Sequence, residues 1–241
     1  MATVKEHYSE VLSEVYSWML GGFEEGVNRN KNFFSEHNIK PESGKIAVDL
    51  GCGCGFQSIP LADSGFSVTA IDIDSGLLGE LERNRGERDI NIINDDLLDF
   101  DNYICSKAEL FICMTDTILH LDSLKRLESL FEKVSKNLED SGSFVITFRD
   151  LTFELEGADG FIPVRSDENT IMTCFLEYFE DVVKVHDVVY LKEDGKWVLK
   201  KSFYNKLRLS VDDVESALKR NGFSKIETSC SNGLTTILSK K

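Results

Sequence analysis

The sequence predicts an α/β fold in which helices cover both faces of a parallel sheet. Short apolar runs rich in β-branched residues alternate with helical segments between residues 45 and 148, a rhythm typical of such a sheet. Between residues 170 and 209, three apolar runs follow one another with only turns between them, which indicates an inserted antiparallel meander. The chain has 241 residues, 41% of them hydrophobic, and this suffices to bury one large core.

The individual elements follow from hydrophobic spacing and from turn residues. In the alternating part, strands are expected at residues 45–50, 66–72, 90–94, 109–114 and 142–148, and helices at residues 56–62, 76–85 and 121–138. In the meander, strands are expected at residues 170–180, 182–191 and 197–209. Ser210 is a suitable N-cap for a helix that ends near Gly222, and residues 223–230 and 234–240 are expected to close the sheet as a hairpin.

The N-terminal segment predicts helices ahead of the first strand. Apolar residues from Tyr8 to Met19 recur at helical spacing, and the glycines at positions 21 and 22 would end this amphipathic helix. A second helix is expected over residues 25–34. The segment carries acidic residues and no uninterrupted apolar stretch, so neither a signal peptide nor a membrane span is expected, and the cytoplasm is the expected location.

The net charge of −15 restricts the class of partner. A nucleic-acid backbone would be repelled over most of such a surface, so we expect a small-molecule substrate and neither a nucleic acid nor a membrane. The six cysteines are expected to stay reduced, and because their spacing contains no pair of zinc knuckles, no metal site is expected.

The stretch VDLGCGCGFQSIPLA, residues 48–62, places a glycine loop between a strand and a helix. Such a loop lets a ligand approach the backbone and presents N–H groups at the positive end of the helix dipole. A nicotinamide-binding loop would need a glycine at Phe56 and an acidic residue about 20 positions further on. Gly51, Gly53 and Asp72 fit that pattern and Phe56 does not, so this loop alone leaves the ligand class open.

Three motifs in the same order resemble those of class I S-adenosylmethionine-dependent methyltransferases. VDLGCGCG is similar to the first motif, with Asp49 two places ahead of Gly51, and VTAIDID resembles the second strand, whose final carboxylate binds the ribose hydroxyls and falls on Asp72. INDDLLDF is similar to the loop whose acidic side chain accepts from the adenine amino group, which aligns with Asp96, with Asp95 as the alternative.

The resemblance, which continues through AELFICMTDTILHL and covers residues 46–148, implies a Rossmann-like, doubly wound, seven-stranded and mostly parallel sheet with one antiparallel strand. It also implies S-adenosylmethionine as the cofactor and a helical lid above it. The cofactor-binding residues expected on this basis are Asp49, Gly51, Cys52, Gly53, Gly55, Asp72, Ile73, Asp95, Asp96, Leu97, Met114, Thr115 and, from the lid, Trp18 in preference to Tyr16. Cys52 and Cys54 are expected to occupy small-residue positions whose backbone matters more than the sulfur.

Candidate catalytic residues follow the fourth and fifth strands, at the sheet edge where open α/β sheets bind ligands. His120 is a candidate base or hydrogen-bonding group for the substrate, or a cap of the next helix. Asp116 could orient His120, hold a substrate amine, or simply make a turn. Arg149 is a candidate contact to the substrate, with a surface ion pair as the alternative.

We interpret the chain as one methyltransferase domain that transfers a methyl group to a nitrogen or oxygen of a small molecule. Its expected parts are a lid at residues 1–41, a cofactor-binding core at 45–150, inserted strands at 151–209, and a helix with a hairpin at 210–241. A nicotinamide-dependent oxidoreductase and a protein that binds S-adenosylmethionine without turnover are the alternatives. The aromatic-rich inserted strands could cover the pocket or form a subunit interface, so a monomer and a homodimer both stay open.

Overall fold

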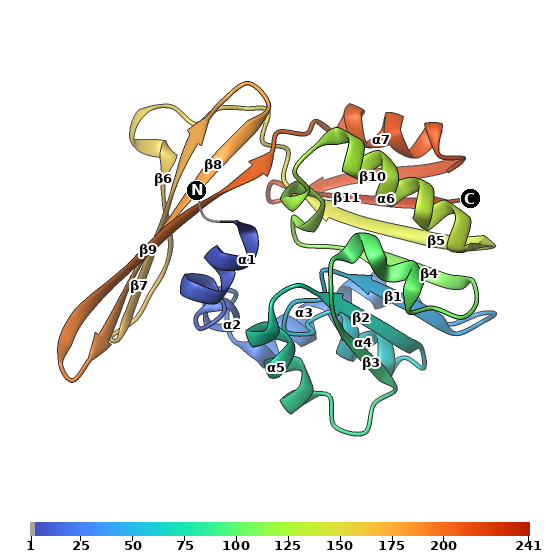
Figure 1. Ribbon diagram of the computed structural model, residues 1–241, viewed down its shortest axis with the longest axis horizontal. Coiled ribbons are helices and arrows are strands. Elements are labelled where there is room, and N and C mark those ends of the chain that lie inside the picture. The colour runs from blue at the N-terminus through green and yellow to red at the C-terminus, as the bar shows by residue number, and fades with distance from the viewer. Residues whose placement is uncertain (1–2) are drawn as a thin grey trace.

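The computed structural model describes residues 3–241 and contains two separate β-sheets (Figure 1). The larger sheet consists of β1 (Ile46–Leu50), β2 (Ser67–Asp72), β3 (Ile90–Asn94), β4 (Ala108–Cys113), β5 (Leu138–Phe148), β10 (Lys225–Ser231) and β11 (Leu234–Lys240). The smaller sheet consists of β6 (Phe161–Ser166), β7 (Thr170–Tyr178), β8 (Val182–Glu193) and β9 (Lys196–Leu207).

The larger sheet has the order β10-β11-β5-β4-β1-β2-β3. The pairs β1–β2, β1–β4, β2–β3 and β4–β5 are parallel, whereas β11 runs antiparallel to both of its neighbours, β5 and β10. This confirms the predicted fold class, a seven-stranded and mostly parallel sheet with one antiparallel strand. Because the parallel strands share one direction, the loops that follow β1, β2, β3 and β4 meet at a single edge.

Helices cover both faces of the larger sheet. On one face, α6 (Leu124–Asn137) and α7 (Val211–Arg220) pack against alternate strand residues such as Val48 and Phe111. On the other face, α3 (Phe23–Glu36), α4 (Ser58–Asp63) and α5 (Ser75–Asn84) pack against the residues between them, such as Ala47 and Leu110. Short 3-10 turns lie at η2 (Leu97–Asn102), η3 (Thr117–His120) and η4 (Gly157–Gly160).

The N-terminal segment differs from the single amphipathic helix that its periodicity predicts. It consists of α1 (Val4–His7), the π-helical turn η1 (Tyr8–Leu12) and α2 (Tyr16–Met19), with a break at Val15. Its buried residues Val11, Leu12 and Val15 pack on the smaller sheet. Contact with that sheet therefore overrides the local preference for a continuous helix, and the segment lies between the two sheets (Figure 1).

The smaller sheet is the predicted meander with one additional strand at its edge. The structure pairs β7, β8 and β9 antiparallel, as expected, and adds β6 beside β7. The sequence does not predict β6 because Pro163 lies inside it and the register shifts beside that residue. Proline is tolerated in such an edge strand, whose outer side has no hydrogen-bonding neighbour.

The glycine loop generates a prediction about stability. Gly55 has φ +91°, and a Cβ there would lie 2.3 Å from Leu81 Cδ1, whereas Gly53 has φ +53° and a Cβ there would meet nothing closer than 3.7 Å. Gly55→Ala should therefore lower the free energy of unfolding by about 3 kcal/mol, through overpacking and backbone strain together. Gly53→Ala should lower it by only about 1 kcal/mol.

Urea denaturation of the two variants measures this difference. Gly53→Ala is the matched control because it introduces the same methyl group two residues away in the same loop. Equal losses of stability in the two variants would contradict the assigned contact between Gly55 and Leu81.

Candidate active site

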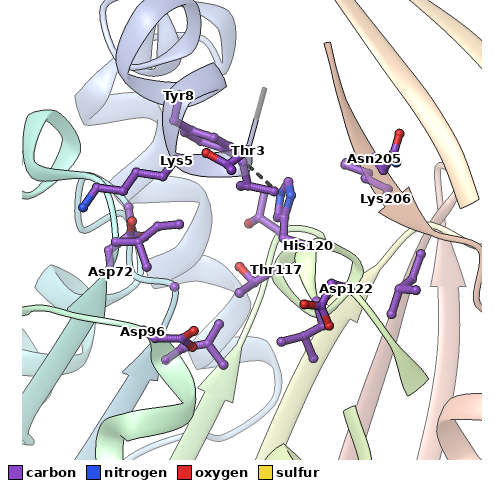
Figure 2. Close-up of a pocket in the computed structure, with 18 of the residues that line it drawn as sticks. Thr3, Lys5, Tyr8, Asp72, Asp96, Thr117, His120, Asp122, Asn205 and Lys206 are labelled. Atoms are coloured by element: carbon purple, nitrogen blue, oxygen red, sulfur yellow. Dashed lines mark hydrogen bonds between the residues drawn. The ribbon is translucent and has the colours of Figure 1, made fainter. Parts of the chain in front are cut away.

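A cavity of about 530 Å³ lies at the carboxyl edge of the parallel strands (Figure 2). Its walls come from the N-terminal segment, the glycine loop, the loops after β2, β3 and β4, and the adjoining ends of β8 and β9. The predicted residues that line it are Gly51, Gly53, Asp72, Ile73, Asp96, Leu97, Thr115 and His120. The predicted residues outside its lining are Trp18, Asp49, Cys52, Gly55, Asp95, Met114, Asp116 and Arg149.

Asp72 ends β2 and is held in place by the glycine loop. One carboxylate oxygen accepts a hydrogen bond from the Gly53 N–H at 2.8 Å, and the other accepts from the Asp74 N–H at 2.9 Å. Each carboxylate oxygen can accept a further hydrogen bond, so Asp72 remains able to bind a pair of hydroxyls. Burial raises the pKa of this carboxyl, against the lowering effect of the two backbone N–H groups.

Asp49 lies beneath the loop and does not reach the cavity. It is 1% exposed and accepts a hydrogen bond from the Ser58 hydroxyl at 2.6 Å. Burial raises the pKa of Asp49 to about 7, because a single hydroxyl compensates little of the lost hydration. Cys52 and Cys54 are likewise buried free thiols, and burial raises their pKa values, that of Cys54 to about 12.

The two aspartates after β3 have different surroundings. Asp96 lines the cavity, caps η2 by accepting from the Leu98 N–H, and forms an ion pair with Arg126. Asp95 instead accepts from the Tyr103 hydroxyl at 2.5 Å and is outside the lining. Of the two alternatives, Asp96 therefore has the position from which it can bind a ligand in the cavity.

The aromatic lining differs from the expectation for Trp18. The Trp18 indole N–H donates to Asp167 at 2.5 Å, and Arg165 stacks over its ring, so this side chain contacts the β6–β7 hairpin. Tyr8 and Tyr16 line the cavity in its place. The breaks within the N-terminal segment change which side chains share a face, and for that reason helical spacing could not predict this outcome.

Asp116 lies just behind the cavity wall, in a strained turn. It and Thr115 adopt left-handed conformations, with φ +67° and +58°. The Asp116 carboxylate accepts from the Arg149 backbone N–H, the Arg149 guanidinium and the Lys206 ammonium, each at 2.8 Å. Burial alone would raise its pKa, but Lys206 and Arg149 hold the pKa well below its usual range, so this carboxyl stays ionised.

His120 ends η3 and faces the cavity beside two tyrosines. Its Nε2 lies 3.3 Å from the Tyr8 hydroxyl, and its ring stacks on Tyr204 with centroids 5.3 Å apart. Among the described residues, buried Nδ1 of His120 has no hydrogen-bond partner. Burial and the nearby Lys206 ammonium lower the pKa of His120 to about 3, so the imidazole is neutral at physiological pH.

The sequence contains no signal for several other lining residues. Tyr8, Thr117, Asn205 and Lys206 all line the cavity, as Figure 2 shows, and none is among the predicted site residues. Asn205 and Lys206 come from β9, which tertiary structure alone brings to the cavity. Thr117 packs directly against Gly51, where a Cβ would lie 2.3 Å from its methyl group, so this contact explains why glycine is needed in the loop.

The site residues fit the cofactor that the motifs imply. The cavity presents an oriented carboxylate at Asp72 and a second carboxylate at Asp96. Ile73 and Leu97 offer apolar side chains for an adenine ring, and the glycine loop and the N-terminal segment also contribute to the lining. Across residues 3–241, no group of three or more histidine, cysteine, aspartate or glutamate side chains is arranged to hold a metal ion. None of the helices described is both long and apolar enough to span a bilayer.

The known proteins that this chain resembles in sequence are methyltransferases. A family described as a methyltransferase domain matches residues 47–142. The cypemycin N-terminal methyltransferase of a Streptomyces species is 28% identical over 123 residues, which are 50% of this chain and 49% of that protein. The glycine/sarcosine N-methyltransferase of Aphanothece halophytica is 23% identical over 158 residues, 65% of this chain and 57% of that protein. The chain thus spans about half the length of these relatives.

Solved structures share the fold over nearly the whole chain. The CcbJ methyltransferase of Streptomyces caelestis superimposes with a TM-score of 0.79 at 14% identity and covers 97% of both chains. A sugar N-methyltransferase of Streptoalloteichus sp ATCC 53650 gives 0.73 at 15% identity, covering 96% of this chain and 94% of the other. The chain thus contains a methyltransferase domain over residues 47–142, within a fold that it shares with S-adenosylmethionine-dependent methyltransferases of known structure.

Proposed function

We propose that this protein transfers a methyl group from S-adenosylmethionine to an amine nitrogen of a small molecule. The observation that carries the proposal is that a single cavity contains both the oriented carboxylate of Asp72 and the neutral imidazole of His120. The first suits a ribose, and the second is a polar group beside which an uncharged nucleophile can be held. A cavity of about 530 Å³ is within the range of small-molecule sites.

The cofactor-binding role rests on the residues at the ends of β1, β2 and β3. When bound, S-adenosylmethionine supplies an electrophilic methyl group. Asp72 would accept from the two ribose hydroxyls, since a carboxylate presents two oxygens in one plane. Asp96 would accept from the adenine amino group, and the Gly51–Gly53 backbone would lie along the amino-acid part. Asp49 would act from below by holding the start of α4 through Ser58.

The state of the ionisable groups favours an amine acceptor over a hydroxyl. A hydroxyl acceptor profits from a base that can take its proton, and His120 with a pKa of about 3 is a weak base. Burial raises the pKa values of Tyr8 and Tyr204, so both phenols stay protonated. A neutral amine needs no prior deprotonation and can donate an N–H to the Tyr8 phenol oxygen, which leaves its single lone pair free to attack the methyl group. Correct positioning then supplies much of the acceleration.

The names of several relatives support the same acceptor class. The two relatives compared by sequence are named as an N-terminal methyltransferase and a glycine/sarcosine N-methyltransferase, and solved neighbours include a sugar N-methyltransferase and an amino pentose methyltransferase. Each of these names concerns a nitrogen acceptor or an amino-substituted one. We extend this shared feature, an amine, to the present chain.

We further propose that the N-terminal segment acts as a lid, within one domain that comprises residues 1–41, 45–150, 151–209 and 210–241. The segment contributes Thr3, Lys5, Tyr8 and Tyr16 to the wall of the cavity. A bound cofactor would therefore be covered by the segment, which excludes water from the reacting groups. The inserted strands would support the lid, because its apolar side chains pack on them.

Substitutions of Asp72 and of the neighbouring residues Asp95 and Asp96 test how the cofactor is recognised. Asp72→Ala should weaken binding of S-adenosylhomocysteine about 100-fold, and Asp96→Asn about 10-fold, as expected for lost hydrogen bonds to a charged group. Asp95→Asn is the matched control for Asp96 and should bind like the unmodified protein, because Asp95 contacts Tyr103 outside the cavity. Isothermal titration calorimetry measures these affinities.

Two results would contradict the cofactor assignment. Tight binding by Asp72→Ala would remove the ribose role of that residue. Thermal stabilisation by NAD in place of S-adenosylhomocysteine would indicate the nicotinamide-dependent alternative.

The neutral state of His120 predicts a pH dependence of stability. Its pKa is about 3 in the folded protein and near the ordinary 6.5 in the unfolded chain, so between these values only the unfolded chain binds the proton. Stability should fall as the pH drops below 6.5, by about 2 kcal/mol at pH 5. His120→Phe should not show this loss of stability. The measurement is the free energy of unfolding of both proteins at pH 5 and at pH 8. Parallel pH curves for the two proteins would show that His120 titrates normally.

The lid predicts a local change in hydrogen exchange. Addition of S-adenosylhomocysteine should slow amide exchange at residues 4–20, because ligand contacts oppose opening of this segment. The amides of α7 provide the internal control, since that helix packs with α6 against the larger sheet and not against the cavity. Exchange at residues 4–20 that is unaffected by a saturating ligand would contradict the lid.

A further inference from the structure

We propose that the acceptor amine carries an anionic group, a carboxylate or a phosphate, which binds to the ammonium of Lys206. This inference deepens the proposed function and rests on it. Lys206 lies on β9, in the wall contributed by the smaller sheet, and Figure 2 shows it on the same side of the cavity as Asn205 and across from Asp72. The cofactor-binding carboxylates and Lys206 thus occupy different parts of one site.

The charges around Asp116 do not balance. Its single carboxylate receives two cations, the Arg149 guanidinium and the Lys206 ammonium. Arg149 by itself satisfies this carboxylate well, because it donates from its backbone N–H to one oxygen and from its guanidinium to the other. Lys206 therefore adds one positive charge more than Asp116 can neutralise.

The surplus charge is poorly hydrated. The Lys206 side chain is only 13% exposed, whereas the Arg149 side chain is 52% exposed and can be hydrated. An ammonium has three N–H donors, and within residues 3–241 the acceptor that it contacts is Asp116 Oδ2. A cation removed from water is costly unless its remaining donors are used, and here they adjoin a cavity. The surroundings of Lys206 therefore favour an anionic ligand.

The sign of this charge is opposite to that of the protein as a whole. With a net charge of −15, most of the surface repels anions, so a local excess of positive charge marks the position where an anion can bind. Among the residues that the structure describes, two other cations line the cavity. Arg126 is 38% exposed and already paired with Asp96, and Lys5 is exposed and belongs to the N-terminal segment. Asp122 also lines the cavity but is exposed and lies 3.7 Å from Arg126 at its nearest approach.

An anion at Lys206 would also orient the amine. His120 and Lys206 line the same wall, and the Lys206 charge contributes to the low pKa of His120. A bound anion would neutralise the surplus charge and fix the position of the acceptor. Lys206 would then hold one end of the acceptor and place the amine at the other end beside His120.

Matched acceptors that differ in charge test the proposal. We would measure kcat/KM by mass spectrometry for glycine against glycinamide, and for glucosamine 6-phosphate against glucosamine. The unmodified protein should prefer the anionic member of at least one pair. Lys206→Gln removes the charge but keeps a donor for Asp116, and it should reduce that preference about 10- to 100-fold, as expected for loss of a charged hydrogen bond.

Two further variants separate charge from structure. Lys206→Arg retains the charge and should retain most of the preference. Lys201→Gln is the matched control, because Lys201 lies on the same strand, is exposed, and is not part of the cavity wall. It should leave the preference unchanged.

A binding measurement covers the case in which no tested amine is methylated. Protein saturated with S-adenosylhomocysteine is titrated with inorganic phosphate or acetate at constant ionic strength, and the thermal midpoint is followed. The unmodified protein and Lys206→Arg should be stabilised by at least one anion, and Lys206→Gln should not.

The outcomes distinguish this inference from the proposed function. Failure to bind S-adenosylhomocysteine would overturn the function itself. Methylation of amines without preference for anionic members, or anion stabilisation that is equal in Lys206→Gln and the unmodified protein, would overturn the role of Lys206 while leaving the function intact.

Discussion

The buried carboxylate of Asp116 joins the two sheets, and the geometry of the site depends on it. It lies in the turn after β4, accepts hydrogen bonds from Arg149 at the end of β5, and forms an ion pair with Lys206 on β9 of the smaller sheet. An ionised carboxylate that is 4% exposed requires such partners. Their contribution also offsets the left-handed backbone of Thr115 and Asp116, which costs about 1–2 kcal/mol per residue.

The N-terminal segment contacts the rest of the protein on two sides. Toward the smaller sheet it buries apolar side chains, including Val11 and Leu12. Toward α5 and the glycine loop it combines two kinds of contact. The Ser13 hydroxyl donates to Asp74 at 2.7 Å and the Ser17 hydroxyl to Glu80 at 2.6 Å, and the Tyr16 ring stacks on Phe56 beside Leu77. Water can replace hydroxyl contacts at little cost, whereas separating apolar surfaces is unfavourable. Opening the segment on either side therefore has to separate apolar surface.

Features of this structure that are set by residues close together in the sequence can be predicted from it, and features set by contacts between distant segments cannot. The predicted bounds of β1 to β4 agree with the structure to within one residue at each end, because a buried parallel strand reads as an apolar run. The cofactor end of the cavity is predictable for the same reason: Gly51, Asp72 and Asp96 each lie at or just beyond the end of such a strand.

Features set by contacts between distant segments are not predictable in this way. The break in the N-terminal helix, at Val15, arises from packing on a sheet that begins only at Phe161. Lys206 lies in a strand of ordinary alternating pattern, where nothing local distinguishes it from Lys201. Only the pairing of β9 with β8 and the position of Asp116 bring its ammonium to the cavity.

Three aspartates at strand ends show why a motif does not by itself define chemistry. Burial raises the pKa of Asp49 to about 7, because one hydroxyl is its partner. Asp72 is oriented by two backbone N–H groups and faces the cavity. Asp116 stays ionised because two cations surround it. The same side chain therefore supports a loop, faces a ligand and joins two sheets, and the partners that other segments supply determine which role each residue has.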